Sequence, residues 1–291
     1  MGEALARAMW ERYEPVHDLI YAPGIRRTSD ALGMRGFWMG YFALRAAPLG
    51  AVHPALVTSC FYVFHRDRVE RALPDAWRYA TPAEVLAARE RAVDAALRQL
   101  LGPEAVTSPE LTEAADLAWA AAMAADTAGR VLGAANQALE RPKEAHVRLW
   151  QAVTTLREHR GDGHVAVLVS HGLGPVAAMV LKAAAGESDG AVLREGRGWD
   201  LAAWRAAEAG LRERGLLAAD GTLTAAGAAE HEAVEARTDA AAERPWAVLG
   251  RNATERLARL LEPLAGAVRG AGLLPSGNPV GLTGTPDATG E

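Results

Sequence analysis

The sequence contains a single cysteine, Cys60, among its 291 residues. One thiol cannot form an intrachain disulfide or build a thiolate metal cluster, and we expect a reducing compartment. The first residues, Met1–Trp10, carry Glu3 and Arg7 and lack an apolar core of signal-peptide length. No run of about 18 uncharged apolar residues occurs, so a membrane span is not expected. We therefore predict a cytoplasmic protein with no membrane partner.

Catalytic and cofactor-binding motifs are also missing. The sequence has no metalloprotease helix, nucleophile elbow, phosphate-binding loop or dinucleotide fingerprint, and a metal site is not predicted. The common enzyme classes are therefore not indicated, although catalysis stays open. No cofactor is predicted, with haem on a lone His17 or His65 as a remote alternative. A basic excess is lacking too, because the net charge is -5, whereas nucleic-acid-binding proteins usually carry a basic region.

What the sequence does contain is helix-forming residues. Hydrophobic residues make up 50% and charged residues 23%, which is typical of globular proteins. Alanine, leucine, arginine and glutamate are strong helix formers and fill most segments. Two starts are well marked, at Thr81-Pro82 and at Ser108-Pro109, where a capping residue precedes proline. We predict helices at about residues 3–13, 34–46, 53–63, 66–72, 82–101, 109–127 and 144–159.

The segment from Leu201 to Ala242 has a different pattern of secondary-structure signals. An amphipathic helix over 201–214 ends at Gly215, which suits a helix C-terminus. Residues 216–224 read as two short strands joined by an Asp-Gly turn, and a further helix begins at about Ala225. Helix, small hairpin and helix is the order of a winged-helix unit.

These residues resemble known proteins. Leu211 to Gly227 resembles the wing of MarR-type regulators, within a similarity that covers about residues 160–240. The whole chain is also similar to a helix-turn-helix family of high-GC bacteria, through 35–42, 45–50 and 156–164. The resemblance implies a fold and no particular chemistry.

We therefore predict a mostly α protein. A helical domain of residues 1–140 packs on a winged-helix domain of residues 141–265, and residues 266–291, rich in Gly, Pro, Thr and Ser, form a disordered tail. Arg35-Gly36 before Leu49-Gly50 echoes Arg160-Gly161 before Leu173-Gly174. This spacing indicates either an ancient duplication, whose first copy has lost its wing, or chance. If the chain arose by duplication, a monomer would imitate a winged-helix dimer. The alternative oligomeric state is a homodimer.

Two groups of residues are candidates for ligand binding. The N-terminal half is rich in aromatic rings, which either fill the core or line a cavity with His17, Tyr62 or His65 as polar contacts. The second group lies at Arg160-Gly161-Asp162-Gly163-His164. Either the glycines turn the chain, Asp162 caps the helix that follows and Arg160 forms an ion pair, or Arg160 and His164 line a pocket between the halves.

DNA binding would use helix 201–214 in the major groove, with the hairpin near phosphates. Trp204, Arg205 and Arg212 are the candidate contacts. Residues 199–239 hold four arginines and eight acidic residues, a net charge of -4, which disfavours binding to a polyanion.

Three functions remain as hypotheses. The first is a winged-helix, MarR-like transcriptional regulator or small-molecule sensor, with a small ligand and double-stranded DNA as partners. The second is a ligand-binding protein or enzyme that uses a pocket between two pseudo-symmetric halves. The third is a protein-protein interaction module that pairs through the helices of residues 109–139.

Overall fold

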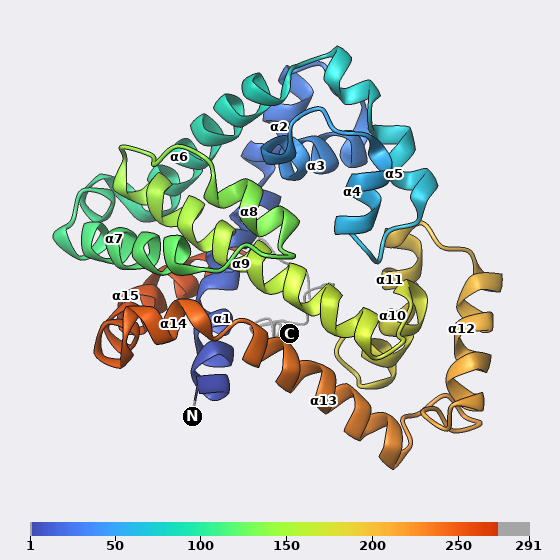
Figure 1. Ribbon diagram of the computed structural model, residues 1–291. Coiled ribbons are helices and arrows are strands. Elements are labelled where there is room, and N and C mark those ends of the chain that lie inside the picture. Colours follow the sequence, from blue (N-terminus) through green and yellow to red (C-terminus); the bar gives the residue numbers. More distant parts are fainter. Residues whose placement is uncertain (1, 273–291) are drawn as a thin grey trace, which may run out of the picture.

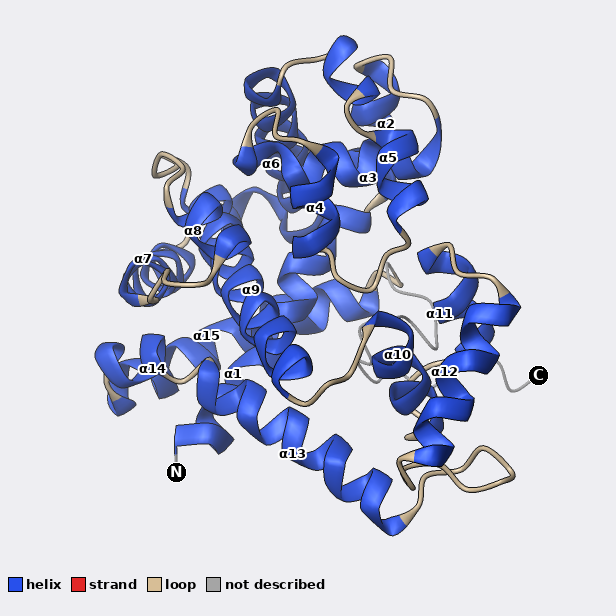
Figure 2. Ribbon diagram, turned by 45° about the vertical axis from the view of Figure 1, so that its right-hand side comes forward, coloured by secondary structure: helices blue, strands red, loops and turns tan. Residues whose placement is uncertain are grey.

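The computed structural model describes residues 2–272, and most of these residues lie in helices joined by loops, with no strand among them (Figures 1 and 2). The mostly α fold is therefore confirmed. The 3-10 helices are η1 (Asp18–Tyr21), η2 (Ala47–Leu49) and η3 (Asp75–Arg78). The α-helices are α1 (Gly2–His17), α2 (Pro23–Ala31), α3 (Gly36–Ala46), α4 (Pro54–Cys60), α5 (Arg66–Ala72), α6 (Pro82–Val106), α7 (Pro109–Ala124), α8 (Val131–Gln137), α9 (Ala145–Ser170), α10 (Pro175–Ala184), α11 (Gly190–Arg197), α12 (Leu201–Glu213), α13 (Ala225–Ala241), α14 (Arg244–Leu249) and α15 (Arg251–Gly270).

The two marked helix starts lie where the sequence places them. The Thr81 side chain accepts a hydrogen bond from the backbone N–H of Glu84, whose carboxylate accepts from Thr81 N at 2.8 Å. The Ser108 side chain accepts from Leu111 N at 3.1 Å. Each side chain satisfies an N–H group that has no partner within its own helix, so these starts depend on local chemistry alone.

Helix α9 crosses the centre of the protein and packs against α1, α6, α7, α8 and α13 (Figure 1). It runs unbroken from Ala145 to Ser170, so the prediction that the glycines near Arg160 turn the chain is wrong. Asp162 does not cap a helix that follows it: it lies inside α9 and accepts a hydrogen bond from Gly133 N, in the first turn of α8, at 2.8 Å.

The glycines serve close packing instead. A Cβ on Gly163 would collide with the guanidinium of Arg130, which donates to the carbonyl oxygens of His159 at 2.6 Å and Ala241 at 2.7 Å. Arg130 thereby links α9 to the end of α13 across the space that the glycine leaves free. Glycine in a helix interior is usually unfavourable, and here it permits this contact.

A pair of glycine variants tests this packing. A Cβ on Gly133 would lie 2.9 Å from His159 Cα, whereas a Cβ on Gly161 would find its nearest neighbour at 3.8 Å. We expect Gly133→Ala to lower the free energy of unfolding by about 1–3 kcal/mol through overpacking. Gly161→Ala should raise it by about 0.5–1 kcal/mol, because alanine favours helix. Urea denaturation measures both; equal stabilities would show that α8 and α9 are not held at this separation.

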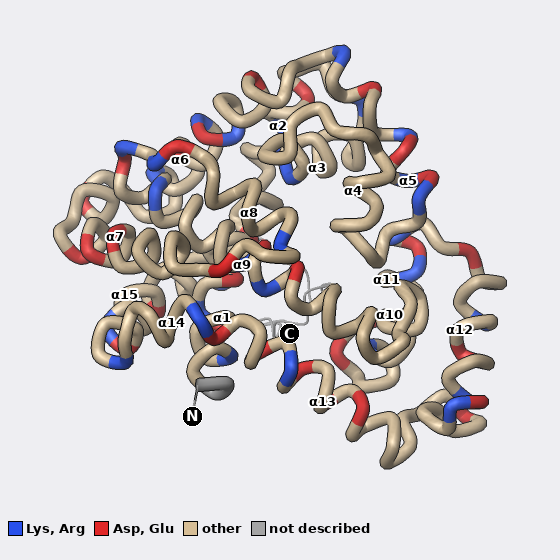
Figure 3. The backbone as a smooth tube through the Cα atoms, viewed as in Figure 1, with Lys and Arg blue, Asp and Glu red and all other residues tan. Residues whose placement is uncertain are grey.

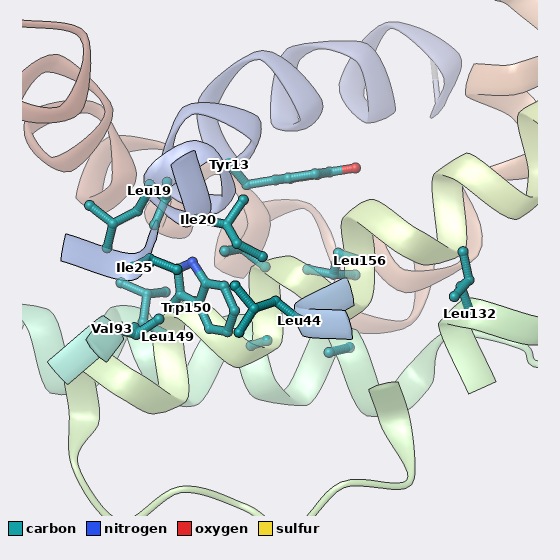
Figure 4. Packing of buried hydrophobic residues seen from close by; sticks show 14 of the residues in the cluster. Tyr13, Leu19, Ile20, Ile25, Leu44, Val93, Leu132, Leu149, Trp150 and Leu156 are labelled. Carbon is teal, nitrogen blue, oxygen red and sulfur yellow. The ribbon is translucent and has the colours of Figure 1, made fainter. Parts of the chain in front are cut away.

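Two hydrophobic cores divide the described residues differently from the expected boundary at residue 140. The first core contains the N-terminal helices, the first part of α9, and also Trp246, Leu257 and Leu261 from α14 and α15. Figure 4 shows its interior around Trp150. The second core runs from Val167 at the end of α9 to residue 234 in α13. The chain thus leaves the first core along α9 and returns to it through α14.

The expected wing is shorter than the sequence suggested. Among the described residues it consists of one antiparallel bridge, between Leu217 and Leu223, closed by a hydrogen bond from Ala218 N to Thr222 O at 2.9 Å. The predicted tail also starts too early, because α15 continues to Gly270. The rest of that prediction, from residue 273, lies outside the described residues.

The two halves share an order of helices. After Leu49-Gly50 come α4, α5 and the long α6, and after Leu173-Gly174 come α10, α11 and α12. No hairpin follows α6, which is joined to α7 through Thr107 and Ser108. This order fits the duplication, which stays a prediction.

No single helix among the described residues is long and apolar enough to cross a membrane. Helices α9 and α10 reach the required length and composition only as a pair bent by 99°, and α9 is largely buried inside the protein.

Candidate functional site

Helices α11 and α12 follow each other across a short turn, in the order of a helix-turn-helix, and both pack against α10. The Asp189 side chain caps α11 by accepting from Val192 N at 2.9 Å. Gly198 ends α11 in the left-handed conformation, with φ 86°, which glycine adopts without a steric penalty. After Trp199, Asp200 caps α12 by accepting from Ala203 N at 2.7 Å. Two helices joined by a short glycine-containing turn define this motif.

The turn is bound to the N-terminal half of the chain. His65 N donates to Arg197 O at 2.9 Å, and Arg68 donates to Glu195 O at 3.1 Å. In the other direction, the Trp199 indole donates to Val63 O at 2.8 Å. These three hydrogen bonds fix the start of α12 against the segment that leads into α5.

A pocket of about 530 Å³ lies at this junction; we call it the turn pocket. Such a volume is usual for small-molecule sites. One wall comes from the start of α3 and from α5, and the other from the turn and the first residues of α12. Its lining residues are Arg35, Gly36, Phe37, Trp38, Met39, His65, Asp67, Arg68, Arg71, Ala72, Gly198, Trp199, Asp200 and Ala203.

The turn pocket is rich in guanidinium groups. Arg35, Arg68 and Arg71 line it, and within residues 2–272 none of the three has an ion pair with a carboxylate. The pKa of the Arg68 guanidinium is lowered by burial and by the nearby charges of Arg71 and Arg197. Three guanidinium groups therefore gather here, against the two lining carboxylates of Asp67 and Asp200.

Of the predicted ligand contacts, the turn pocket contains only His65. Its Nδ1 accepts from Asp67 N at 3.2 Å, which caps α5, and its ring meets Trp199 edge-on at 4.7 Å. Tyr62 lies at the junction of the halves but outside the pocket lining, and its hydroxyl donates to Leu173 O at 2.7 Å. His17 is buried in the first core, where its Nδ1 lies 3.1 Å from Thr154 Oγ1.

Arg160 and His164 do not meet at the turn pocket either. Arg160 is buried and forms an ion pair with Asp239 of α13 at 2.7 Å, as the structural alternative predicted. His164 Nδ1 lies 2.9 Å from Thr238 Oγ1, also on α13, and burial lowers its pKa to about 4. Both side chains attach α13 to α9. His159 and His164 both lie on the continuous helix α9.

The outward face of α12 carries few polar groups. Leu201 is 46% exposed, and alanines at 202, 206 and 209 are exposed beside Arg205. Trp204 points the other way: it is 8% exposed and belongs to the second core. The prediction that Trp204 contacts DNA is therefore corrected, since a buried indole cannot reach a base. The guanidinium of Arg212 is partly engaged within the protein, because it donates a hydrogen bond to Ala218 O at 3.3 Å.

A buried charged cluster went unnoticed in the sequence. Arg45 of α3 donates to the Glu158 carboxylate at 2.5 Å, and Arg157 donates to the same carboxylate at 2.9 Å. Arg157 also bonds to Glu14 of α1 at 3.2 Å. Burial raises the pKa of Glu158, but the two guanidinium groups outweigh it and hold this pKa at about 2. The only sequence signal was polar residues recurring on the inner face of α9.

A metal centre was not predicted. Among the described residues, no group of three or more His, Cys, Asp or Glu side chains is placed to hold a metal ion. Cys60 is half-buried and forms no disulfide bond. Burial raises the pKa of its thiol to about 11, so it is a weak nucleophile at neutral pH.

The fold and the α11–α12 unit define a helix-turn-helix protein. Residues 6–275 match the helix-turn-helix family, and because this match spans nearly the whole chain, the protein belongs to that family. No curated protein and no solved structure matches it. The resemblance to a helix-turn-helix family is thus confirmed at the level of the family.

Proposed function

We propose that the protein is a DNA-binding regulator of the MarR-like, winged-helix kind, controlled by a small molecule in the turn pocket. Helix α12 would enter the major groove, with the short hairpin after it near the backbone. The observation that carries the proposal is the double use of the turn at residues 198–200, which connects the two helices of the motif and also forms a wall of the turn pocket.

This double use links the two sites mechanically. A molecule that presses on Trp199 or Asp200 also acts on the start of α12, because Asp200 is its N-cap. A ligand that binds one position of α12 better than another shifts the equilibrium between the two positions. Where DNA also prefers one of them, the ligand changes the DNA affinity by the same factor by which DNA changes the ligand affinity. The protein would act as a monomer whose halves imitate a dimer, or as a homodimer.

One segment of the N-terminal half is basic, unlike residues 199–239. Residues 26–78 hold eight arginines and four acidic residues, a net charge of +4, and part of this segment lies against the start of α12. Figure 3 shows both signs of charge along α12 and α13. The electrostatic objection to DNA binding therefore weakens locally, at the start of α12 where this basic segment lies.

The test is a gel-shift assay with the DNA upstream of the protein's own coding sequence, at several salt concentrations. We expect Arg205→Ala to weaken binding and to reduce the slope of log affinity against log salt by about one, because one cation leaves the interface. Arg91→Ala is the control, since Arg91 is exposed on α6. A wild-type protein that shifts no DNA at low salt would refute the regulator, and equal slopes for the two variants would refute the placement of α12.

The second candidate function is a ligand-binding protein or enzyme that no longer uses DNA. It is favoured by the alanine-rich outward face of α12, where Arg205 is the exposed cation and Trp204 is withdrawn into the core. Ligand binding without a DNA shift would support it. A haem ligand at His17 or His65 stays a remote hypothesis, for which a visible absorption spectrum is the test.

The interaction-module hypothesis has less support. In α7, one of the helices that this hypothesis would pair with a partner, Ala118, Ala121 and Ala122 are buried at 0% exposure. Helix α7 makes its most extensive contact with α9 of the same chain. That face is therefore occupied internally.

A further inference from the structure

The charge of the turn pocket favours an anionic ligand. Its three guanidinium groups, Arg35, Arg68 and Arg71, have no carboxylate ion pair among the described residues. Two carboxylates also belong to the lining: Asp67 is 62% exposed and lies 3.9 Å from His65 Nδ1, while Asp200 caps α12. The lining therefore has an excess of one positive charge, and its guanidinium N–H groups are free of carboxylate partners and can bind an anion.

Two of the three guanidinium groups are also held in place. Arg68 lies over the Trp38 ring at 4.6 Å and donates to Glu195 O. Arg35 lies over the Tyr79 ring at 5.7 Å. A planar fork of N–H donors that is already oriented loses little entropy on binding, and it matches the oxygens of a phosphate better than a single ammonium would.

Aromatic rings form the rest of the recognition surface. Phe37 is 42% exposed and, with Trp38, belongs to the wall from α3. Trp199 belongs to the opposite wall, with His65 against its edge. A flat ring between these walls would bury apolar area on both sides, which stabilises stacked aromatic ligands.

We infer that the turn pocket binds a planar aromatic ring that carries a phosphate group, the chemistry of a nucleoside monophosphate. The ring lies between the walls of α3 and the turn, and the phosphate meets the three arginines. The inference rests on the proposed function for the pocket itself and goes beyond it in naming the chemical class of the ligand.

The experiment is a titration of the full-length protein, followed by tryptophan fluorescence because Trp38 and Trp199 line the pocket. The probes are AMP, adenosine, inorganic phosphate and 1-naphthyl phosphate. We expect saturable binding of AMP and of 1-naphthyl phosphate, with adenosine and inorganic phosphate each at least about tenfold weaker, because each lacks one of the two recognised groups.

Variants locate the site. Arg35→Gln combined with Arg71→Gln should weaken AMP binding at least about tenfold, and both side chains are exposed, so the fold should survive. Arg66→Gln is the matched control, because Arg66 also lies on α5 but is paired with Glu70 at 2.6 Å and does not line the pocket. Circular dichroism confirms that each variant is folded.

Several results would overturn the inference. They are the absence of saturable binding for both phosphate esters, equal affinity for adenosine and AMP, or an effect of Arg66→Gln as large as that of the double variant. If the double variant instead flattens the salt dependence of DNA binding while AMP does not bind, these arginines contact DNA phosphates. A DNA shift without AMP binding rejects the ligand class and keeps the regulator, whereas AMP binding without a shift does the reverse.

Discussion

Glu158→Gln is expected to lower the free energy of unfolding by about 3–5 kcal/mol, the usual result of removing one partner from a buried ion pair. The side chains of Arg45 and Glu158 are 6% and 3% exposed. Without the carboxylate, the Arg45 guanidinium stays out of water with no negative partner, while Arg157 retains Glu14. Urea denaturation at pH 7 gives the free energy, provided that the transition is two-state.

Two further variants separate charge pairing from general disturbance. Glu70→Gln removes an exposed pair with Arg66, whose side chain is 65% exposed, and should cost at most about 0.5 kcal/mol. Replacing both Arg45 by methionine and Glu158 by leucine removes the two charges together and should recover much of the lost stability. If Glu158→Gln costs no more than Glu70→Gln, the buried pair does not hold α3 to α9.

The same carboxylate predicts a dependence on pH. The pKa of Glu158 is about 2 in the folded protein and about 4.3 in an unfolded chain. Its contribution is therefore complete above the unfolded value and is lost as the pH falls from about 4.3 toward 2. Because glutamine does not titrate, the stability difference between wild type and Glu158→Gln should shrink over this range. A constant difference would place the pKa of Glu158 near its ordinary value.

Trp204→Ala is expected to cost about 3–5 kcal/mol of stability, the usual loss for a large aromatic side chain removed from a core. Trp204 packs in the second core, and its indole donates to Glu208 at 3.1 Å. Because that core also positions α12, we expect the helix-turn-helix of the Trp204→Ala variant to melt at a lower temperature than the first core of the same variant. Differential scanning calorimetry and near-ultraviolet circular dichroism measure the effect.

The comparison with Arg205→Ala distinguishes a core residue from a DNA contact. Trp204→Phe keeps most of the apolar contact and should cost clearly less than the alanine variant, and Arg205→Ala should leave stability within about 0.5 kcal/mol of wild type. Should Trp204→Ala instead keep wild-type stability and lose only DNA binding, the indole would face DNA, as the sequence had suggested.

Helix positions were predictable where the signal was local. The cap-and-proline pairs at Thr81 and Ser108 start α6 and α7, and the predicted range 66–72 coincides with α5. The prediction failed where a local signal was overridden. Glycines 161 and 163 favour a turn by propensity, yet contacts from α8 and Arg130 on several sides keep α9 helical there.

The candidate site was only partly predictable. Of the residues predicted to line a cavity in the aromatic-rich N-terminal half, His65 lies in the turn pocket. His17, Arg160 and His164 instead stabilise the packing of α1 and α13 on α9. Histidine occurs both in the pocket, as His65, and among the packing residues, as His17 and His164. Only the burial of each side chain and the residues that it contacts distinguish the two roles.

The sequence by itself determined the helical class, the starts of its best-capped helices, and helix α12 with the glycine that closes it, because capping, glycine φ and helical periodicity act over a few residues. The tertiary structure alone decided that Trp204 is a core residue and that Arg35, Arg68 and Arg71 meet Trp199 across one pocket. It also decided that Glu158 is ionised between two arginines. These properties depend on which distant segments meet and on how far water is excluded between them, and neither is encoded in the spacing of neighbouring residues.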